Sequence, residues 1–557
     1  MSFSYHHHTT MPTSFALIPP EVLEHIALYT ACSEFLGPPS GLLSLLTLNH
    51  TVHAALSLKN NPRLYAQIFA LKFDINAAIR RLGADRINAT TLSEELVRRC
   101  TLLSRFRSRV DGKLTESGEL AEGQGDMIDS MLWMAYLMML ENDGYNERQL
   151  IEYGRIDEWL KEFWFDPMGS SQATLSIRAD IWPENCERMS LAMWLFWMLI
   201  KPKAYIEDDD LFRDATGILK LVALGAHKYP LCYPSWNDFI PVKCNTVPSR
   251  IRHFSTELQM VAPAPAAPAI LSYLTLANAL AVSFESLNYI KPLAPTVLSS
   301  VTTKSSAEWD GEWNRALSVG NSDIVLGNTL SQAFKPGCLD GVWEGLFTYT
   351  EFTSYAALLS GAPPATLQRS LVAQHRQTWK LREYHLLEYP SDVSEDEIFN
   401  RAESPKPLTS DPLGPGNPSR GYIPNGTEIR QLEGNGAIEV FERGRREPII
   451  YRSYSSLLTD EVKQKELAKG KVRVKDIFVI GEGHSAWGQF SLIGRVRPSD
   501  GFISLSKEYV NGHRGKWLYR SYLVGDTNGN LSGRWRDTLT DPQMEGYEGC
   551  FVMSRRR

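Results

Sequence analysis

The chain has 557 residues, which is long enough for two to four separately packed domains. Its 43% hydrophobic and 22% charged residues are typical of globular proteins, and a net charge of −6 gives no reason to expect nucleic acid binding. The seven cysteines lie far apart without a CxxC pair, which argues against a zinc site or disulfide framework and favours a reducing cytoplasmic or nuclear compartment.

The first part of the chain predicts three short helices. Two prolines suit a first helical turn, and apolar residues then recur on one stripe: Pro19 and Pro20, then Val22, Leu23, Ile26 and Tyr29. After a Gly/Pro turn at 37–41, two leucine-rich runs continue to about residue 58. Helices this short cannot enclose a core, so we expect something else to cover much of their apolar surface.

This stretch resembles the F-box, the three-helix module that attaches a substrate receptor to the Skp1 adaptor of a cullin-based ubiquitin ligase. The matching residues are Ile18, Pro19, Pro20, Glu21, Leu23 and Ile26, followed by leucine-rich helices. Asn49 and His50 stand where many F-boxes have a Cys-Arg or Ser-Lys pair. The resemblance implies Skp1 binding through Ile18, Pro19, Pro20, Val22, Leu23, Ile26, Leu45 and Leu48. The alternative interpretation is an ordinary helical start to a larger domain.

More helices are predicted up to about residue 290. Asn61 and Pro62 have the pattern of an N-cap and first helical residue, and Thr91 to Glu94 that of a capping box. Several later runs are apolar nearly all round, as in the interior helices of a bundle. The charge-poor stretch 258–284 indicates a buried helix over about 269–284 rather than a membrane span. We therefore predict an F-box-like module with a following helix at 15–75 and an all-helical middle domain at 76–336.

From residue 337 the hydrophobic pattern alternates with the period of a strand. Strands are predicted at 341–352, 377–387, 437–444 and 447–454, and then as successive hairpins to residue 554, with glycines where a sheet bends. Residues 390–426 are rich in Pro, Ser, Gly and acidic residues, which predicts a long exposed or disordered loop. The segment 337–557 is thus expected to be an antiparallel β-barrel, and the whole chain a multidomain α+β protein.

This C-terminal segment also resembles a known family. The stretches GHSAWGQFSLIGRVR, DGFISLSKEYV, GKWLYRSYL and GNLSGRWRDT are similar to the C-terminal barrel of a family of F-box proteins, many of them fungal. In that family the barrel is a substrate-binding domain, and the order of F-box, helices and barrel is the same. Two distant stretches therefore imply one family.

The sequence contains no catalytic motif that we could identify. The glycine-rich 481–485 lacks the Lys-Ser/Thr of a P-loop, and 526–530 lacks the Gly and Glu of a calcium loop. We expect no enzyme activity, no cofactor and no metal. Aromatic and guanidinium side chains suited to protein recognition gather in the barrel, at Arg514, Trp517, Tyr519, Arg534 and Trp535. The alternative is that these rings face the core and the arginines face solvent.

The predicted function is a non-catalytic substrate receptor of a Skp1–cullin–F-box ubiquitin ligase. Its expected partners are a Skp1-like adaptor, through it a cullin, and an unidentified protein substrate, with neither nucleic acid nor membrane. Two other functions stay open. One is a lipocalin-like barrel that carries a small ligand. The other is a protein scaffold that works without ubiquitin.

Overall fold

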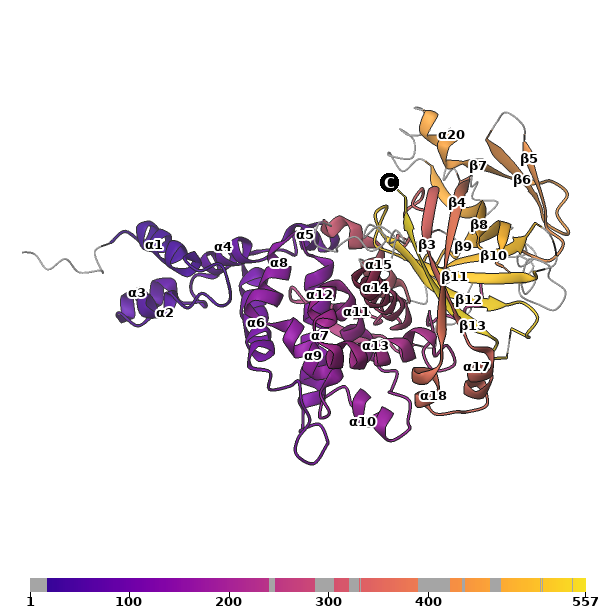
Figure 1. The fold of residues 1–557 in the computed structure, drawn as a ribbon. Helices are drawn as coiled ribbons and strands as arrows, with labels where there is room; N and C mark the ends of the chain where they lie inside the picture. The colour runs from indigo at the N-terminus through magenta and orange to yellow at the C-terminus, as the bar shows by residue number, and fades with distance from the viewer. Residues whose placement is uncertain are drawn as a thin grey trace, which may run out of the picture. The chain divides into compact units, whose positions relative to one another are not determined.

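The computed structural model describes residues 18–556 except 240–245, 286–304, 320–329, 331, 389–420, 433–435, 461–471, 511, 513 and 543. These residues form an α+β protein, with helices in the first part and middle of the chain and an antiparallel barrel in its C-terminal part (Figure 1). The predicted fold class is confirmed. Most of the predicted loop at 390–426 lies outside the described residues.

Two compact units make up the chain. The N-terminal unit runs to Val110 and includes Glu141–Ile156 and Arg252–Glu257, and the barrel unit contains Asp111–Leu140, Asp157–Ile251 and Leu258–Arg557. This division differs from the predicted boundaries after residues 75 and 336. The helices of the middle region belong with the barrel because α14 (Ala266–Glu285) packs directly on its strands.

The N-terminal unit is helical. It contains α1 (Pro20–Cys32), α2 (Leu42–Leu46), α3 (His50–Leu56), α4 (Pro62–Lys72), α5 (Asn76–Leu82), α6 (Ala89–Ser108), α8 (Tyr145–Arg148) and the π-helix η2 (Gln149–Tyr153). Helix α4 begins as predicted, since the Asn61 side chain accepts a hydrogen bond from the backbone N–H of Leu64 at 3.0 Å. Helix α6 begins before the predicted Thr91, because Asn88 is its N-cap and Thr91 is the N3 residue of the capping box.

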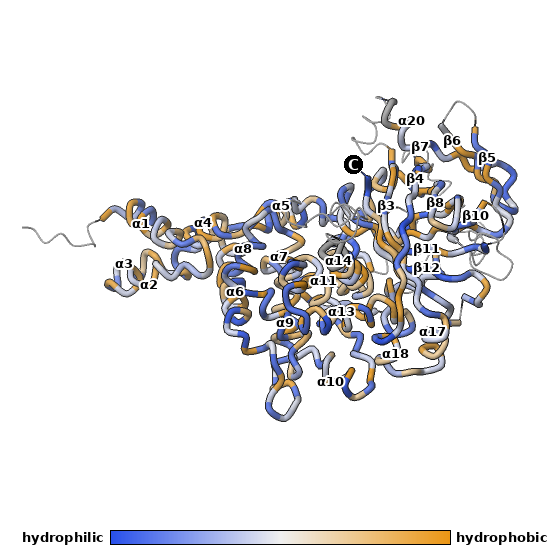
Figure 2. Tube along the Cα trace, viewed as in Figure 1, coloured by the Kyte–Doolittle hydropathy of each residue, from blue (hydrophilic) through white to orange (hydrophobic). Residues whose placement is uncertain are grey.

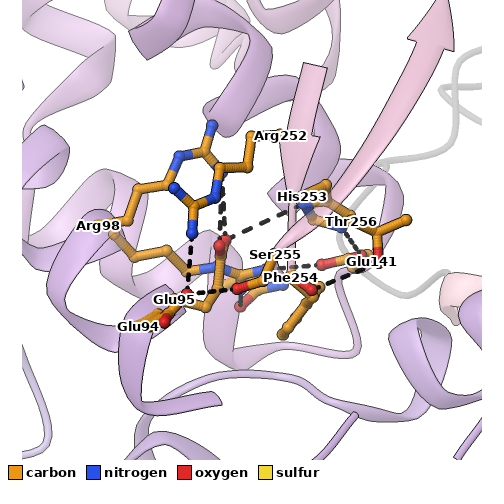
Figure 3. Close-up of polar contacts among 11 residues, drawn as sticks. Glu94, Glu95, Arg98, Glu141, Arg252, His253, Phe254, Ser255 and Thr256 are labelled. Carbon is orange, nitrogen blue, oxygen red and sulfur yellow. Dashed lines mark hydrogen bonds and ion pairs between the residues drawn. The ribbon is translucent and has the colours of Figure 1, made fainter. Parts of the chain in front are cut away.

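A buried charged network joins the three segments of this unit, and we call it the Arg99 network. Arg99, wholly buried on α6, donates to Glu95 at 3.0 Å and to Glu141 at 2.8 Å. Glu141 also contacts His253 Nε2 at 2.6 Å (Figure 3). The guanidinium of Arg99 lies 5.0 Å from the ring centroid of Phe69. Because α6 contributes Arg99 and Glu95, 141–156 contributes Glu141, and 252–257 contributes His253, the network joins the three segments.

The helices of the barrel unit include several that are buried on all sides, as predicted. They are α7 (Gln124–Leu140), α9 (Ile156–Phe165), α10 (Ala173–Arg178), α11 (Glu187–Leu199), α12 (Pro202–Ile206), α13 (Asp209–Leu224), α14, η5 (Ser306–Trp309), α15 (Asp310–Val319), α17 (Phe352–Leu359), α18 (Pro364–Arg369) and α20 (Tyr454–Thr459). Every residue of α11 from Met189 to Leu199 is buried. The all-helical prediction for 76–336 missed one hairpin, β1 (Ser249–His253) with β2 (Thr256–Met260).

Eight of the described strands close into an antiparallel barrel. In spatial order they are β3 (Gly341–Thr350), β13 (Glu548–Arg555), β12 (Asn530–Asp537), β11 (Lys516–Val524), β10 (Ile503–Tyr509), β9 (Gly488–Val496), β8 (Arg473–Ser485) and β4 (Val372–Glu388), and β4 pairs again with β3. A small extension of β7 (Ile449–Ser453), β6 (Ala437–Phe441) and β5 (Glu428–Leu432) leaves the ring at β4.

Glycines allow the strands of this barrel to approach closely. A Cβ atom at Gly494 would lie 1.8 Å from the backbone oxygen of Ser504, and one at Gly533 would lie 1.9 Å from that of Arg520. Only glycine fits at these positions, which supports the predicted role of strand glycines in bending the sheet. The segment 481–485, considered above as a possible phosphate loop, is part of strand β8.

Across the described helices, none combines the length and hydrophobicity that a membrane span requires.

Candidate functional site

Helix α1 has two apolar stripes, and one of them is exposed. Leu23, Ala27 and Ala31 are buried and face the unit's own core. Val22 is 47% exposed and Tyr29 is 76% exposed, and the spacing of seven residues places them on one stripe. The short α2 and the turn after it add Leu43, which is 66% exposed, and Leu48. Figure 2 shows hydrophobic positions along these helices. We call these residues the exposed leucine face.

The helices that carry this face are fixed from behind. The Tyr65 hydroxyl on α4 donates to the backbone oxygen of Leu56 at the end of α3, at 3.0 Å. Asn61 donates to Glu24 on α1 at 2.8 Å. Gln149 accepts from the backbone N–H of Gly37 at 2.8 Å. The helices that carry the exposed leucine face are therefore supported by hydrogen bonds to the rest of the unit.

The predicted adaptor-binding residues divide into exposed and buried groups. Pro19, Pro20, Val22 and Leu48 are exposed, and Ile18, Ile26 and Leu45 are half-buried. Leu23 is only 5% exposed in this arrangement of the helices, and its role in adaptor binding stays a prediction. It fills the core because it lies on the stripe of Ala27 and Ala31. The sequence prediction did not include Leu43. The position of Leu43 beside the turn at 37–41 could have indicated that its side chain is exposed.

A second candidate surface lies at one end of the barrel. Five aromatic rings meet there, and we call them the aromatic end: Tyr349, Trp487, Trp517, Trp535 and Tyr547. The ring centroids of Tyr349 and Trp535 are 6.0 Å apart, and those of Trp517 and Trp535 are 5.2 Å apart. The antiparallel register brings the C-terminal ends of β3, β8, β10 and β12 to this end.

Large hydrophobic side chains are exposed around the aromatic end. One is Tyr349 (38%), near the end of β3. The others lie in the segments that join the strands: Phe352 (64%), Leu371 (76%), Val510 (69%), Leu539 (94%) and Met544 (65%). An exposed apolar group of this size around aromatic rings is typical of a protein-binding surface.

The predicted substrate-binding residues also separate in the structure. Trp517 and Trp535 belong to the aromatic end, where Trp517 donates to the backbone oxygen of the exposed Arg514 at 3.0 Å. Tyr519 lies one layer deeper in the barrel and is buried. Arg534 lies on the outer wall and donates to the backbone oxygens of Val222, Ala223 and Tyr229. These carbonyls already occupy its guanidinium, and its role in substrate binding stays a prediction.

The prediction missed Tyr349, Trp487 and Tyr547. Tyr349 could have been found, because the alternation of β3 places it on the face of Phe347, at the open end of the strand. Trp487 stands in the β8–β9 turn, and its ring centroid is 5.1 Å from that of Phe347. No local pattern reveals that a residue in such a turn folds back over the barrel.

Below the aromatic end, one lysine is buried inside the barrel. Lys507 on β10 is 1% exposed, and its Nζ lies 3.3 Å from Gln377 Oε1 and 3.4 Å from the Tyr519 hydroxyl. The same atom is 3.8 Å from the ring centroid of Phe490. Burial lowers the pKa of Lys507 to about 7.

The described cysteines are free thiols, and the described residues contain no cluster of three metal-binding side chains. No family model matches the chain, and no curated protein or solved structure was found to be similar to it. Function must therefore be argued from the two exposed surfaces.

Proposed function

We propose that the chain is a substrate receptor of a Skp1–cullin–F-box ubiquitin ligase. The observation that carries the proposal is the exposed leucine face, on a small helical framework with the opening residues of an F-box. An adaptor that covers Val22, Tyr29 and Leu43 would remove this apolar surface from water. The receptor itself then has no chemistry to perform, because it accelerates ubiquitin transfer by holding the substrate near the charged enzyme.

Placing a carboxylate on the exposed leucine face should block adaptor binding. We expect Val22→Asp to weaken binding of purified Skp1 by about tenfold or more, since a charge at an apolar contact must be desolvated. Biolayer interferometry with the full chain measures this. Val97→Asp is a matched control, because Val97 on α6 is 46% exposed and Val22 is 47% exposed. Absence of Skp1 binding by the wild-type chain, or an equal loss in both variants, would refute the proposal.

We further propose that the aromatic end binds the substrate. We expect Phe352→Asp to reduce substrate capture about tenfold while Skp1 binding is unchanged, because Phe352 is exposed at this end and far in sequence from α1. Quantitative mass spectrometry of proteins retained by the tagged full chain in cells measures the loss. Ile450→Asp is the control, since Ile450 is 50% exposed on β7, outside the ring. Retention of the same proteins by the Phe352 variant would place the substrate elsewhere.

The packed barrel interior argues against one of the two other functions, and an experiment distinguishes the second. A lipocalin-like carrier needs space within its barrel, whereas this interior is packed with large side chains such as Trp343, Trp379 and Phe551. A scaffold that works without ubiquitin differs from a ligase receptor in that its bound protein is not ubiquitinated. A reconstituted Skp1–cullin complex that contains the chain should transfer ubiquitin to the captured protein, and a scaffold would not support that transfer.

A further inference from the structure

The outer wall of the barrel carries three adjacent arginines, which we call the arginine cluster. Arg520 on β11 is directly opposite Arg534 on β12, and Arg536 is the next residue of β12 on the same face. All three are buried, with exposed fractions of 6%, 5% and 4%. Guanidinium groups stay charged in proteins, so each of them requires an acceptor or an anion when it is buried.

Two members of the cluster have such partners. Arg534 donates to three backbone oxygens, as described above. Arg536 donates to the backbone oxygens of Asp541 and Met544, and its Nη1 lies 3.9 Å from a carboxylate oxygen of Glu548. Glu548 is the one carboxylate within ion-pair distance of the cluster in the described part of the chain. Three guanidiniums beside one carboxylate leave an excess of two positive charges.

The third member, Arg520, has no polar partner among the described residues. Its Nη2 is fully buried and has no hydrogen bond, and no carboxylate among the described residues forms an ion pair with it. One face of its guanidinium is covered by the ring of Trp236, with Cζ 3.0 Å from the ring centroid. Trp236 is half-buried, and its neighbour Ser235 is exposed. The Arg520 guanidinium, with its unbonded Nη2, therefore packs against a ring that is itself partly exposed.

The electrostatics agree with this geometry. Burial lowers the pKa of Arg520 to about 9, with Glu548 opposing the shift and Arg536 adding to it. A buried positive charge without compensation is unfavourable, and a bound anion is the simplest way to compensate it. Two excess positive charges match a phosphate group, which carries between one and a half and two negative charges at neutral pH. The planar N–H fork of arginine also suits two phosphate oxygens.

We propose that Arg520, with Arg536 beside it and Trp236 above it, binds a phosphate group on the outer wall of the barrel. The group is either free inorganic phosphate or the phosphate of a modified side chain. This site is separate from both the exposed leucine face and the aromatic end, so its existence does not depend on the ligase function.

Calorimetry and thermal unfolding of the full chain test the site, with inorganic phosphate and phosphoserine as separate probes and sodium chloride at matched ionic strength. We expect phosphate to bind at one site and to raise the unfolding temperature. Arg520→Met should weaken this binding by at least about tenfold. Arg382→Met is the control, because Arg382 on β4 is partly exposed and already paired with Glu482. If Arg520→Met does not fold, Arg520→Lys removes the planar fork and should give the same loss.

The two probes identify the source of the group. Binding of inorganic phosphate alone supports a free anion, and binding of phosphoserine supports a modified side chain. The proposal is overturned if the wild-type chain binds neither probe at millimolar concentration, or if the Arg382 variant loses binding as strongly as the Arg520 variant.

Discussion

Replacement of Lys507 by methionine is expected to stabilise the barrel unit by up to about 4 kcal/mol at pH 7. The pKa of a lysine is 10.5 in its ordinary state and about 7 at this position, and one pKa unit corresponds to about 1.4 kcal/mol. Methionine keeps most of the apolar chain that packs against Phe490 and Tyr519, and it removes the amine that burial disfavours.

The pH dependence of this effect has a definite sign. The folded state releases the Lys507 proton at a lower pH than the unfolded state, so the unfolded chain binds more protons between about pH 7 and 10.5. Stability from this residue therefore rises with pH across that window. The gain from Lys507→Met should be largest at pH 7 and below, and it should shrink toward pH 10.

Denaturant unfolding of the full chain at several pH values, monitored by tryptophan fluorescence, measures the gain. Lys516→Met is the control, because Lys516 on the neighbouring strand is partly exposed and pairs with Glu508 at 2.9 Å. It should change stability by less than about 1 kcal/mol. A methionine variant that is less stable than wild type at pH 7 would show that the charged amine has favourable partners in the barrel.

The fold class was predictable from sequence because the hydrophobic period changes near residue 337. Strand alternation places Trp343 and Phe347 on one face, and the structure shows both in the barrel core. The unit boundaries were not predictable in the same way. Helix α14 is apolar all round whether it packs on helices or on strands, so its sequence does not show that the barrel covers it.

The candidate sites were predictable only in part, because periodicity does not show which of two apolar stripes meets the core. Val22 and Leu23 are consecutive and similarly hydrophobic, yet one is exposed and the other is buried. Arg534 and Arg514 are likewise the same residue type on neighbouring segments. Only the backbone oxygens of Val222 and Ala223, more than 300 residues away in sequence, distinguish their roles. Such long-range contacts leave no local signal.

The Arg99 network is expected to stabilise the framework that supports the exposed leucine face. Removing Arg99 leaves the buried carboxylate of Glu141 without a guanidinium partner and leaves Glu95 with only the longer contact to Arg98. Breaking a buried ion pair in this way typically costs about 3–5 kcal/mol. Arg99→Met should therefore destabilise the N-terminal unit by about that amount and weaken Skp1 binding indirectly.

Lowering the pH should also reduce the stability that the Arg99 network gives to the N-terminal unit. Burial alone would raise the pKa of Glu141, but His253 and Arg99 together lower it to about 2 from an ordinary value of 4.5. A carboxylate with a lowered pKa stabilises the folded state above its unfolded pKa, so this contribution should be lost as the pH falls from about 4.5 to about 2. Circular dichroism of Glu141→Gln and wild type over this range should show a weaker acid dependence in the variant.

Hydrogen exchange of the full chain locates the effect of Arg99→Met, because peptides from α6 and from 141–156 report on the N-terminal unit and barrel peptides report on the other unit. Faster exchange is expected in the first set only. Arg98→Met is the matched control, since Arg98 is one residue away, is 25% exposed, and contacts Glu95 at 3.4 Å from the solvent side. It should cost less than about 1 kcal/mol. Equal protection in wild type and Arg99→Met would mean that the network does not hold the three segments together. The exposed leucine face would then be supported by the contacts of Tyr65, Asn61 and Gln149 alone.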